Sequence, residues 1–551
     1  MLYPKIPLAQ SLIEIFRQKG IKHIVISPGS RNAPLTIGFA SNPNFTCYSI
    51  ADERVAGFFA LGIAQQLQKP VAVVCTSGSA LLNYYPALAE AFYSQIPFVV
   101  VSADRPLSKI DIGDGQTIRQ QNVFENHSLY NANLNEEQSE ENDRKICEAL
   151  DISLLKKGPV HINVPFEEPL YETTDIPNFT NVTNFADETN ITNLSDSLNS
   201  YKNSWYSYQK KLILVGTNYP HEIDSEIIEK LANDPSVVVM TESTSNLHHK
   251  KFVNKIDVLI TSFSEEDFKA LQPDLLITFG GMIVSKRIKA FLRKYKPEQH
   301  WHIDTLRAYN TFGSLTHHIK ENPNDFFKKL LPETTEIQSN YSAFIQKIKS
   351  EREEKALTFA KTAPYSDYSV FEKIVNFLPD NIQLQISNSS AIRYLQLFDL
   401  KPSIKVFCNR GTSGIDGSTS TAVGASVISE EPVVLITGDI GFFYDSNALW
   451  NNYIPENFKI ILINNSGGGI FRILPGHQKN EVFSTFFETQ HNLNASHLAK
   501  MFGFNYFQAQ NELETEIGLE RFLQCDSKCI LEIKTPTDIN NEVLREFFNF
   551  L

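Results

Sequence analysis

Short runs of apolar residues, each followed by a turn and often by helical spacing of hydrophobic positions, recur along most of the chain. In its first third these runs are residues 23–27, 46–50, 71–75, 97–102 and 160–164. Runs of this length suit strands that are buried on both faces of a parallel sheet, with helices in the connections. The pattern therefore predicts an α/β domain over residues 1–170.

Residues 171–205 interrupt this pattern because they are rich in Asn and Thr and show no sustained apolar period. Such a stretch is typical of a linker. Apolar runs then resume at residues 211–216, 237–240, 274–280 and 300–304, and they predict a middle domain over residues 206–335.

The last part of the chain opens with a charged stretch of helical spacing at residues 344–355, which predicts a helical linker over 336–365. Further apolar runs predict a third domain over 366–551, and they are residues 382–386, 404–408, 433–437, 460–463 and 529–533. A chain of 551 residues exceeds what one hydrophobic core organises, at about 150 residues per domain. We therefore expect an α/β protein of three doubly wound parallel-sheet domains.

Composition and charge limit the kinds of molecule that the protein is expected to bind. The chain is 42% hydrophobic and 21% charged, as is usual for a soluble enzyme, and its net charge of −13 argues against a nucleic-acid partner. No apolar run approaches the roughly 18 to 20 residues that cross a bilayer, and the first residues lack the pattern of a secretory signal. We therefore expect a cytoplasmic protein without a membrane partner. The six Cys have no paired CxxC spacing, which favours reduced thiols over a zinc site or disulfides.

A candidate metal site follows two of the apolar runs in the third domain. Gly438 and Asp439 end one run, and Asn464 and Asn465 end the next, with Asn465 lying 26 residues after Asp439. This spacing accommodates a strand, a crossover helix and a parallel strand, so the side chains should emerge at the same edge of the sheet. A carboxylate, an amide oxygen and a nearby backbone carbonyl suit Mg²⁺. Taken alone, these residues could equally be a loop Asp and two turn Asn.

This pair of motifs resembles the diphosphate-anchoring motif of thiamine diphosphate (ThDP) enzymes, with Ile440 in place of the usual third glycine. In that family a glutamate opening a helix after the second strand faces the aminopyrimidine ring of the cofactor, and Glu53 fits this position. Taken alone, Asp52 and Glu53 would be favourable charges at the positive end of a helix. The resemblance implies that Glu53 holds the N1′ proton in an apolar pocket, which would raise its pKa.

Finer motifs in all three domains resemble the family of 2-succinyl-5-enolpyruvyl-6-hydroxy-3-cyclohexene-1-carboxylate synthases, the MenD family of menaquinone biosynthesis. They are residues 27–35, 102–106, 115–120, 285–287, 388–393, 409–417 and 467–471. The resemblance implies a transferase that decarboxylates 2-oxoglutarate on ThDP and adds the succinic semialdehyde carbanion equivalent 1,4 to isochorismate. Both substrates carry two carboxylates, which explains basic residues at strand-end motifs in an acidic protein.

The family's roles can be carried over by position. For the cofactor and its Mg²⁺, with Mn²⁺ as an alternative ion, they fall on Glu53, Ile415, Gly438, Asp439, Asn465 and Gly467. For isochorismate they fall on Ser30, Arg31, Arg105, Lys286 and Arg287, with Ile470, Phe471 and Leu474 as an apolar wall. For the part derived from 2-oxoglutarate they fall on Gln116, Ser389, Arg393 and Arg410, which with Glu53 form the expected catalytic set. Taken alone, Ile415 and the three wall residues would be ordinary packing residues, and any single Arg an ordinary surface residue.

Two positions depart from the family pattern, and alternatives remain. Gly115 stands where relatives often have an amide residue, and Ser466 stands where they often have Asn. The alternatives are another ThDP-dependent 2-oxoacid decarboxylase or carboligase, or a non-catalytic paralogue. Pyruvate decarboxylases carry adjacent histidines in the loop that corresponds to residues 111–116, which has none here. The resemblance also implies a homodimer or homotetramer with active sites at the subunit interfaces.

Overall fold

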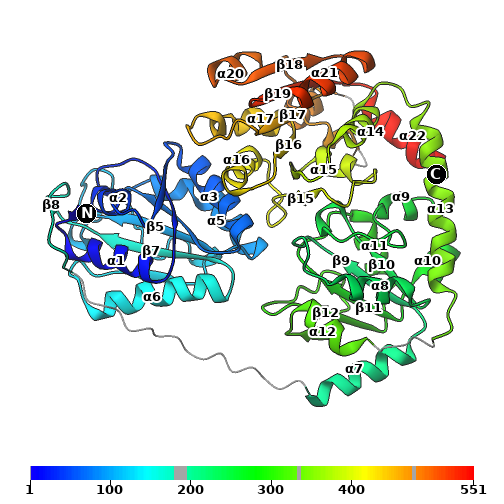
Figure 1. Ribbon diagram of the computed structural model, residues 1–551, viewed down its shortest axis with the longest axis horizontal. Coiled ribbons are helices and arrows are strands. Elements are labelled where there is room, and N and C mark those ends of the chain that lie inside the picture. Colours follow the sequence, from blue (N-terminus) through cyan, green and yellow to red (C-terminus); the bar gives the residue numbers. More distant parts are fainter. Residues whose placement is uncertain (1, 179–194, 332–336, 474–479) are drawn as a thin grey trace.

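Three parallel sheets, each flanked by helices, make up the computed structural model, which describes residues 2–178, 195–331, 337–473 and 480–551. In Figure 1 the first sheet and its helices stand to the left, the third lies at the upper right, and the middle one lies below the third. The α/β class predicted from the apolar runs is confirmed.

The first sheet has the strand order β3-β2-β4-β5-β7-β6, and all its pairs are parallel. Its strands are β2 (His23–Ile26), β3 (Thr46–Ser49), β4 (Val71–Cys75), β5 (Phe98–Asp104), β6 (Asn131–Asn133) and β7 (Pro159–Pro165). The short strands β1 (Tyr3–Pro4) and β8 (Thr173–Thr174) form a separate antiparallel pair. Helices α1 (Pro7–Gln18), α2 (Ala33–Ala40) and α6 (Glu140–Leu155) cover one face of the large sheet. Helices α3 (Glu53–Leu67), α4 (Ala80–Asn83) and α5 (Tyr85–Ser94) cover the other.

The middle sheet has the order β10-β9-β11-β12-β13 and is also parallel. Its strands are β9 (Lys211–Val215), β10 (Val237–Met240), β11 (Leu275–Phe279), β12 (Gln299–Ile303) and β13 (His317–Ile319). Its helices are α7 (Ser195–Ser207), α8 (Ser225–Asn233), α9 (Ile256–Ile260), α10 (Glu265–Leu271), α11 (Lys286–Lys294) and α12 (Pro323–Leu330). The expected helical linker contains α13 (Tyr341–Ala360), which runs along the right edge of Figure 1.

Helix α7 corrects one sequence expectation, since it occupies the end of the stretch predicted to be a linker. Its Trp205 is fully buried in the core of the middle domain, and Tyr201 packs edge-on against Trp301 at a centroid distance of 4.9 Å. These two aromatic side chains give the helix its buried side. Most other residues of the helix are polar, so the sequence shows no helical period of apolar positions. Residues 179–194 of the predicted linker lie outside the described ranges.

The third sheet has the order β15-β14-β16-β17-β19-β18, again parallel. Its strands are β14 (Gln383–Ile386), β15 (Lys405–Phe407), β16 (Val433–Gly438), β17 (Lys459–Asn464), β18 (Asn505–Ala509) and β19 (Cys529–Lys534). Its longer helices are α14 (Asp367–Phe377), α16 (Ser418–Ile428), α21 (Glu512–Gln524) and α22 (Asn540–Phe550). Shorter ones are α15 (Ser390–Leu395), α17 (Asp439–Tyr444), α18 (Ile470–Ile473), α19 (Glu481–Phe483) and α20 (Ser496–Met501).

The parallel pairing of β16 and β17 puts Gly438 opposite Ile463. Both strands therefore end at the same edge of the sheet, as the spacing of the metal motif predicts. The residues that follow them, Asp439 and Asn465, leave the sheet on that edge.

The first and third domains of one chain share a core through α3 and α16, which lie side by side. A Cβ on Gly62 of α3 would lie 2.1 Å from the carbonyl oxygen of Thr421, and one on Gly424 of α16 would lie 2.0 Å from that of Phe59. The two backbones are so close that only glycine fits at these crossings. Helix α3, which begins at Glu53, is thus held against the domain that carries the metal motif.

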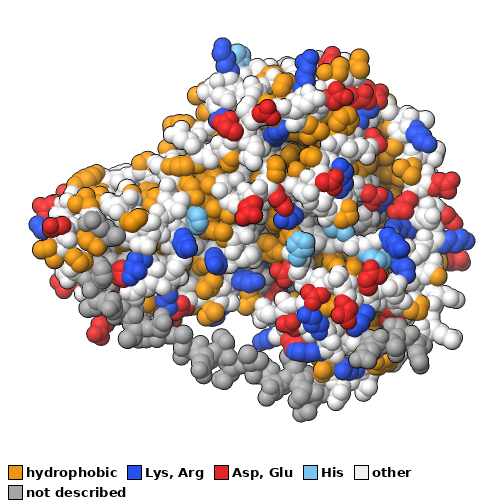
Figure 2. Space-filling view, in the orientation of Figure 1, with side chains coloured by type: hydrophobic (Ala, Val, Ile, Leu, Met, Phe, Trp, Pro, Cys, Tyr) orange, Lys and Arg blue, Asp and Glu red, His pale blue; other side chains and the backbone are white. Residues whose placement is uncertain are grey.

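The face drawn in Figure 2 shows no large patch of one charge, because Lys and Arg side chains lie among Asp and Glu side chains. Among the described helices, none combines the length and the apolar character needed to span a bilayer.

Candidate functional site

The edge of the third sheet holds a buried carboxylate. Asp439 begins α17 at the end of β16 and is 3% exposed. Its Oδ1 accepts a hydrogen bond from the amide of Ile440 at 2.7 Å, and its Oδ2 accepts one from the amide of Gly467 at 3.0 Å. Gly467 has a φ of 150°, and a Cβ there would lie 2.7 Å from the carbonyl oxygen of Glu488. Position 467 therefore requires glycine, because a larger residue could not place its amide against Asp439 without meeting Glu488.

The two adjacent asparagines have different roles. The Asn464 amide is used within the fold, because its Nδ2 donates to Glu532 Oε1 at 2.5 Å and to the carbonyl oxygen of Leu493 at 2.9 Å. The Asn465 Nδ2 donates to Asp367 Oδ2 at 2.9 Å, while its buried Oδ1 has no hydrogen-bond partner among the described residues. A buried amide oxygen without a partner beside a buried carboxylate fits a hard cation such as Mg²⁺.

The loop of residues 409–417, which carries Arg410 and Ile415, is held from two sides. Asn388 Nδ2 donates to the carbonyl oxygens of Asn409 and Gly414, both at 2.7 Å. From the first domain, Glu90 on α5 accepts hydrogen bonds from the amides of Gly411 at 2.7 Å and Thr412 at 2.6 Å. Ile415 packs against α17, because a Cβ on Gly441 would lie 3.7 Å from the Ile415 Cβ.

Glu53 is the first residue of α3 and is half-buried. Its neighbour Asp52 caps the helix by accepting from the amide of Val55 at 3.1 Å. Burial raises the pKa of Glu53, and the negative charge of Asp52 raises it further. The same end of α3 is tied to the third domain, because Arg54 donates to the carbonyl oxygen of Tyr444 at 2.8 Å and Asn447 donates to Asp52 at 2.9 Å. A carboxyl held in this way keeps its proton at a higher pH than an ordinary glutamate.

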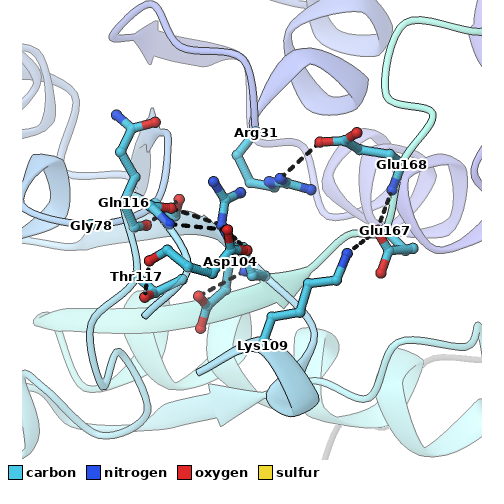
Figure 3. Close-up of polar contacts among 12 residues, drawn as sticks. Arg31, Gly78, Asp104, Lys109, Gln116, Thr117, Glu167 and Glu168 are labelled. Carbon is cyan, nitrogen blue, oxygen red and sulfur yellow. Dashed lines mark hydrogen bonds and ion pairs between the residues drawn. The ribbon is translucent and has the colours of Figure 1, made fainter. Parts of the chain in front are cut away.

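Arg31, one of the expected isochorismate residues of the first domain, lies in a group of ion pairs and hydrogen bonds (Figure 3). Arg31, in the loop between β2 and α2, is 5% exposed and donates to the carbonyl oxygen of Phe166 at 3.0 Å and to Glu168 at 3.2 Å. Burial lowers the pKa of Arg31, and the nearby charge of Arg105 lowers it further. Ser30 beside it is exposed. Two guanidinium groups close to each other form a site for an anion.

Arg105 and Gln116 are positioned by the loop after β5. Arg105 Nε donates to the carbonyl oxygen of Gly115 at 2.9 Å and lies 3.2 Å from Asp114. Gln116 has a φ of 55°, and its carbonyl oxygen accepts from Ser77 Oγ at 2.9 Å, which leaves its side chain exposed. The backbone carbonyl of Gly115 thus orients Arg105.

In the middle domain, Lys286 and Arg287 are exposed at the start of α11. The Arg287 guanidinium lies 4.6 Å from the centre of the Phe548 ring on α22, so α22 of the third domain orients it. The turn before α11 is fixed by Glu242, which accepts from the amides of Val284 and Ser285, both at 2.7 Å. Burial raises the pKa of Glu242 to about 7.

Arg393 and Arg410 form a second cationic group, in the third domain. Arg410 Nη1 donates to Asn388 Oδ1 at 2.6 Å, and the buried Nε atoms of both arginines have no hydrogen-bond partner among the described residues. Burial lowers the pKa of Arg393, with a contribution from the charge of Arg410, and the carboxylates of Asp257 and Glu242 oppose that effect. Ser389 immediately precedes α15, the helix that carries Arg393, and has a φ of 72°. Buried guanidinium atoms without partners are suited to bind a carboxylate.

The structure brings some of the predicted residues together and separates others. In the described part of one chain, no hydrogen bond or ion pair joins the group at Arg31 and Arg105 to the group at Arg393 and Arg410. The expected apolar wall is seen in part: Ile470 and Phe471 are half-buried, and the Phe471 ring packs against Phe487 at 5.9 Å. Leu474 lies outside the described residues.

Three buried carboxylates that touch the candidate site escaped the sequence analysis: Glu90, Glu242 and Asp367. In the sequence each is an ordinary acidic residue in a helix or beside a strand, with no motif around it. Their importance comes from partners far along the chain, such as the Glu90 contact across 321 residues. No local signal could have identified them.

Comparison with known proteins adds three family matches in succession along the chain. The family described as "Thiamine pyrophosphate enzyme, N-terminal TPP binding domain" matches residues 6–129. "Middle domain of thiamine pyrophosphate" matches residues 186–386, and "Thiamine pyrophosphate enzyme, C-terminal TPP binding domain" matches residues 389–533. These matches cover most of the chain.

Several curated relatives share one name, 2-succinyl-5-enolpyruvyl-6-hydroxy-3-cyclohexene-1-carboxylate synthase. The relative from Flavobacterium psychrophilum is 64% identical over 551 residues, and the one from Flavobacterium johnsoniae is 63% identical over 557, each covering 100% of both chains. The relative from Porphyromonas gingivalis is 38% identical over 558 residues, covering 98% of this chain and 96% of its own.

Proposed function

Because the chain belongs to the 2-succinyl-5-enolpyruvyl-6-hydroxy-3-cyclohexene-1-carboxylate synthase family of thiamine pyrophosphate (ThDP) enzymes, we propose that it performs this synthesis in menaquinone biosynthesis. In this reaction 2-oxoglutarate loses CO₂, and its remaining four-carbon unit is added 1,4 to isochorismate. When bound, ThDP supplies the carbanion chemistry that both steps require. The chain would therefore act as a transferase.

The observation that carries the proposal is the pair of Asp439 and Asn465 at one sheet edge. The Asn465 Oδ1 is buried and has no partner among the described residues. Asp439 contacts the loop that carries Asn465, because it accepts a hydrogen bond from the Gly467 amide at 3.0 Å. We assign the Asp439 and Asn465 side chains and the Gly467 carbonyl to Mg²⁺, with Mn²⁺ as an alternative ion. Gly438, which precedes Asp439, would leave room for the diphosphate, since a Cβ there has open space around it.

Glu53 and Ile415 would serve the organic part of the cofactor. With its pKa raised by burial, Glu53 can hold a proton toward the ring nitrogen N1′ and promote the imino tautomer. Ile415, held in the 409–417 loop, would support the bent conformation of the cofactor. Both side chains are half-buried. This setting favours the neutral carboxylic acid form of Glu53 and suits the apolar side chain of Ile415.

The two cationic groups would bind the substrates. Arg393 and Arg410, with Ser389 and Gln116, would hold the part derived from 2-oxoglutarate, because their buried Nε atoms have no partner in the described part of the chain. Isochorismate would be held by Ser30, Arg31, Arg105, Lys286 and Arg287, with Ile470 and Phe471 as an apolar wall. Leu474, the third wall residue expected from the sequence, lies outside the described residues. Each charge-assisted hydrogen bond in such a pocket contributes about 1.5 to 3 kcal/mol.

A complete site would close between subunits of a homodimer or homotetramer in the cytoplasm. The support is that the two cationic groups are not joined within the described part of one chain, although both are needed for one reaction. A symmetric pair of chains would form two equal sites.

A coupled assay tests the proposed activity. The protein is incubated with ThDP, Mg²⁺, 2-oxoglutarate and isochorismate, and the loss of the isochorismate absorbance is followed. We expect turnover that depends on all four additions, and little when pyruvate replaces 2-oxoglutarate. Binding of ThDP without loss of isochorismate would identify another ThDP-dependent carboligase, and failure to bind ThDP would point to a non-catalytic paralogue.

A further inference from the structure

Asp367 lies beside the proposed metal site without being one of its ligands. It begins α14 and is 2% exposed. Its Oδ2 accepts from Asn465 Nδ2 at 2.9 Å, and its Oδ1 accepts from Thr535 Oγ1 at 2.5 Å. The carboxylate is therefore wedged between the loop after β17 and the residue that follows β19.

We infer that Asp367 is a positioning residue that sets the affinity for the metal by fixing which end of the Asn465 amide faces it. An amide has an oxygen and a nitrogen of nearly equal size, so its shape does not distinguish the two orientations. A carboxylate accepts hydrogen bonds and can pair only with the NH₂ end. The Asn465 oxygen is then left on the opposite side, where it has no partner among the described residues. This inference rests on the metal site proposed above.

The backbone around Asn465 supports the same orientation. A Cβ on Gly469 would lie 2.8 Å from Asn465 Nδ2, so a glycine at this point makes room for the NH₂ end where it meets Asp367. The Asn465 carbonyl accepts from Thr537 Oγ1 at 3.1 Å, and the Asn464 carbonyl accepts from the Thr535 amide at 3.1 Å. The loop and Asp367 are thus both tied to the segment after β19, and the Asp367 contact determines the orientation of the amide.

Removal of such an outer partner typically weakens metal binding by 10- to 100-fold. The substitution Asp367→Asn is isosteric and lets the new amide offer its own NH₂ to the Asn465 oxygen. The Asn465 amide can then turn over and present its NH₂ group to the cation, which repels it. We expect the Mg²⁺ concentration that half-saturates ThDP binding to rise by 10- to 100-fold in this variant.

A swap of the two side chains separates this role from a structural one. In Asp367→Asn/Asn465→Asp the NH₂ donor and the carboxylate acceptor exchange places, and either oxygen of the new carboxylate can face the metal. We expect the swap to restore the half-saturating Mg²⁺ concentration to within about 5-fold of wild type. The control Thr535→Val removes the other bond to Asp367 and should change that concentration less than 3-fold.

The measurement is equilibrium dialysis of ThDP against metal-free protein over a Mg²⁺ series, with circular dichroism to confirm folding. Wild-type protein that binds ThDP without need of Mg²⁺ would remove the proposed metal site itself. Wild-type Mg²⁺ dependence with an unchanged Asp367→Asn variant would overturn only the role of Asp367. A weak Asp367→Asn variant that the swap does not rescue would reduce Asp367 to a packing role. If Asp367→Asn does not fold, the swap alone decides, and a loss above 10-fold in it refutes the inference.

Discussion

Glu90 offers a direct test of how the first domain controls the loop of residues 409–417. Glu90 is 1% exposed, and its carboxylate accepts four hydrogen bonds. One oxygen accepts from the Gly411 amide at 2.7 Å and from Ser94 Oγ at 2.6 Å. The other accepts from the amide and the hydroxyl of Thr412, at 2.6 and 2.8 Å. Two oxygens therefore serve two donors each.

Glu90→Gln keeps the size of the side chain but replaces one oxygen with an NH₂ group. If that NH₂ group faces Thr412, the two charge-assisted bonds from Thr412 are lost, each worth about 1.5 to 3 kcal/mol. The amide and the hydroxyl of Thr412, which are both donors, then face the NH₂ donor of the new side chain. A loss of about 3 kcal/mol taken wholly from the ordered loop corresponds to about 100-fold. The bonds from Asn388 to the same loop offset part of it. We expect kcat/KM for 2-oxoglutarate to fall by 10- to 100-fold, because the loop carries Arg410 and Ile415.

Steady-state kinetics at saturating isochorismate measure the effect, with thermal unfolding to confirm that the fold persists. Ser94→Ala is the matched control, because it removes one bond to the same carboxylate and leaves the bonds from Glu90 to the loop in place, and it should stay within 3-fold of wild type. A Glu90→Gln enzyme whose kcat/KM also stays within 3-fold would refute the idea that this contact orders the loop.

Three further outcomes follow from the geometry. Glu53→Gln should lower kcat by at least 100-fold while ThDP affinity changes little, and undiminished turnover would exclude its proton-holding role. Burial raises the pKa of Glu242 to about 7, so the native state binds its proton more tightly than the unfolded chain does. That contribution to stability is complete below pH 4.5 and is lost as the pH rises to about 7. The Tm of wild type minus that of Glu242→Gln should therefore fall over this window, and a constant difference would contradict the shift. Gly424→Ala should lower the free energy of unfolding by about 1 to 3 kcal/mol, since its Cβ would lie 2.0 Å from the Phe59 carbonyl oxygen. An unchanged Tm would mean that α3 and α16 separate easily.

Most of the fold could be predicted from the sequence because strands buried on both faces read as continuous apolar runs. Within the three parallel sheets, the strands that the pattern did not show are β6, β13 and β18, and each lies at the end of its sheet. The two-residue strands β1 and β8, which pair with each other outside these sheets, were not shown either. Each of these three edge strands is only partly buried, so its sequence is mixed: β18, for example, has one buried residue out of five. Helix α7 was missed for a related reason, since only a few of its residues face the core.

For the site, the sequence by itself determined which ligand groups each short motif provides. The spacing of Asp439 and Asn465 along two apolar runs decides that a carboxylate and an amide leave one sheet edge, because strand length and crossover length are local properties. The tertiary structure alone decided which asparagine keeps a free oxygen and which carboxylates orient the site. Asp367 reaches Asn465 from 98 residues away and Glu90 reaches Gly411 from 321, and such contacts depend on the packing of whole domains.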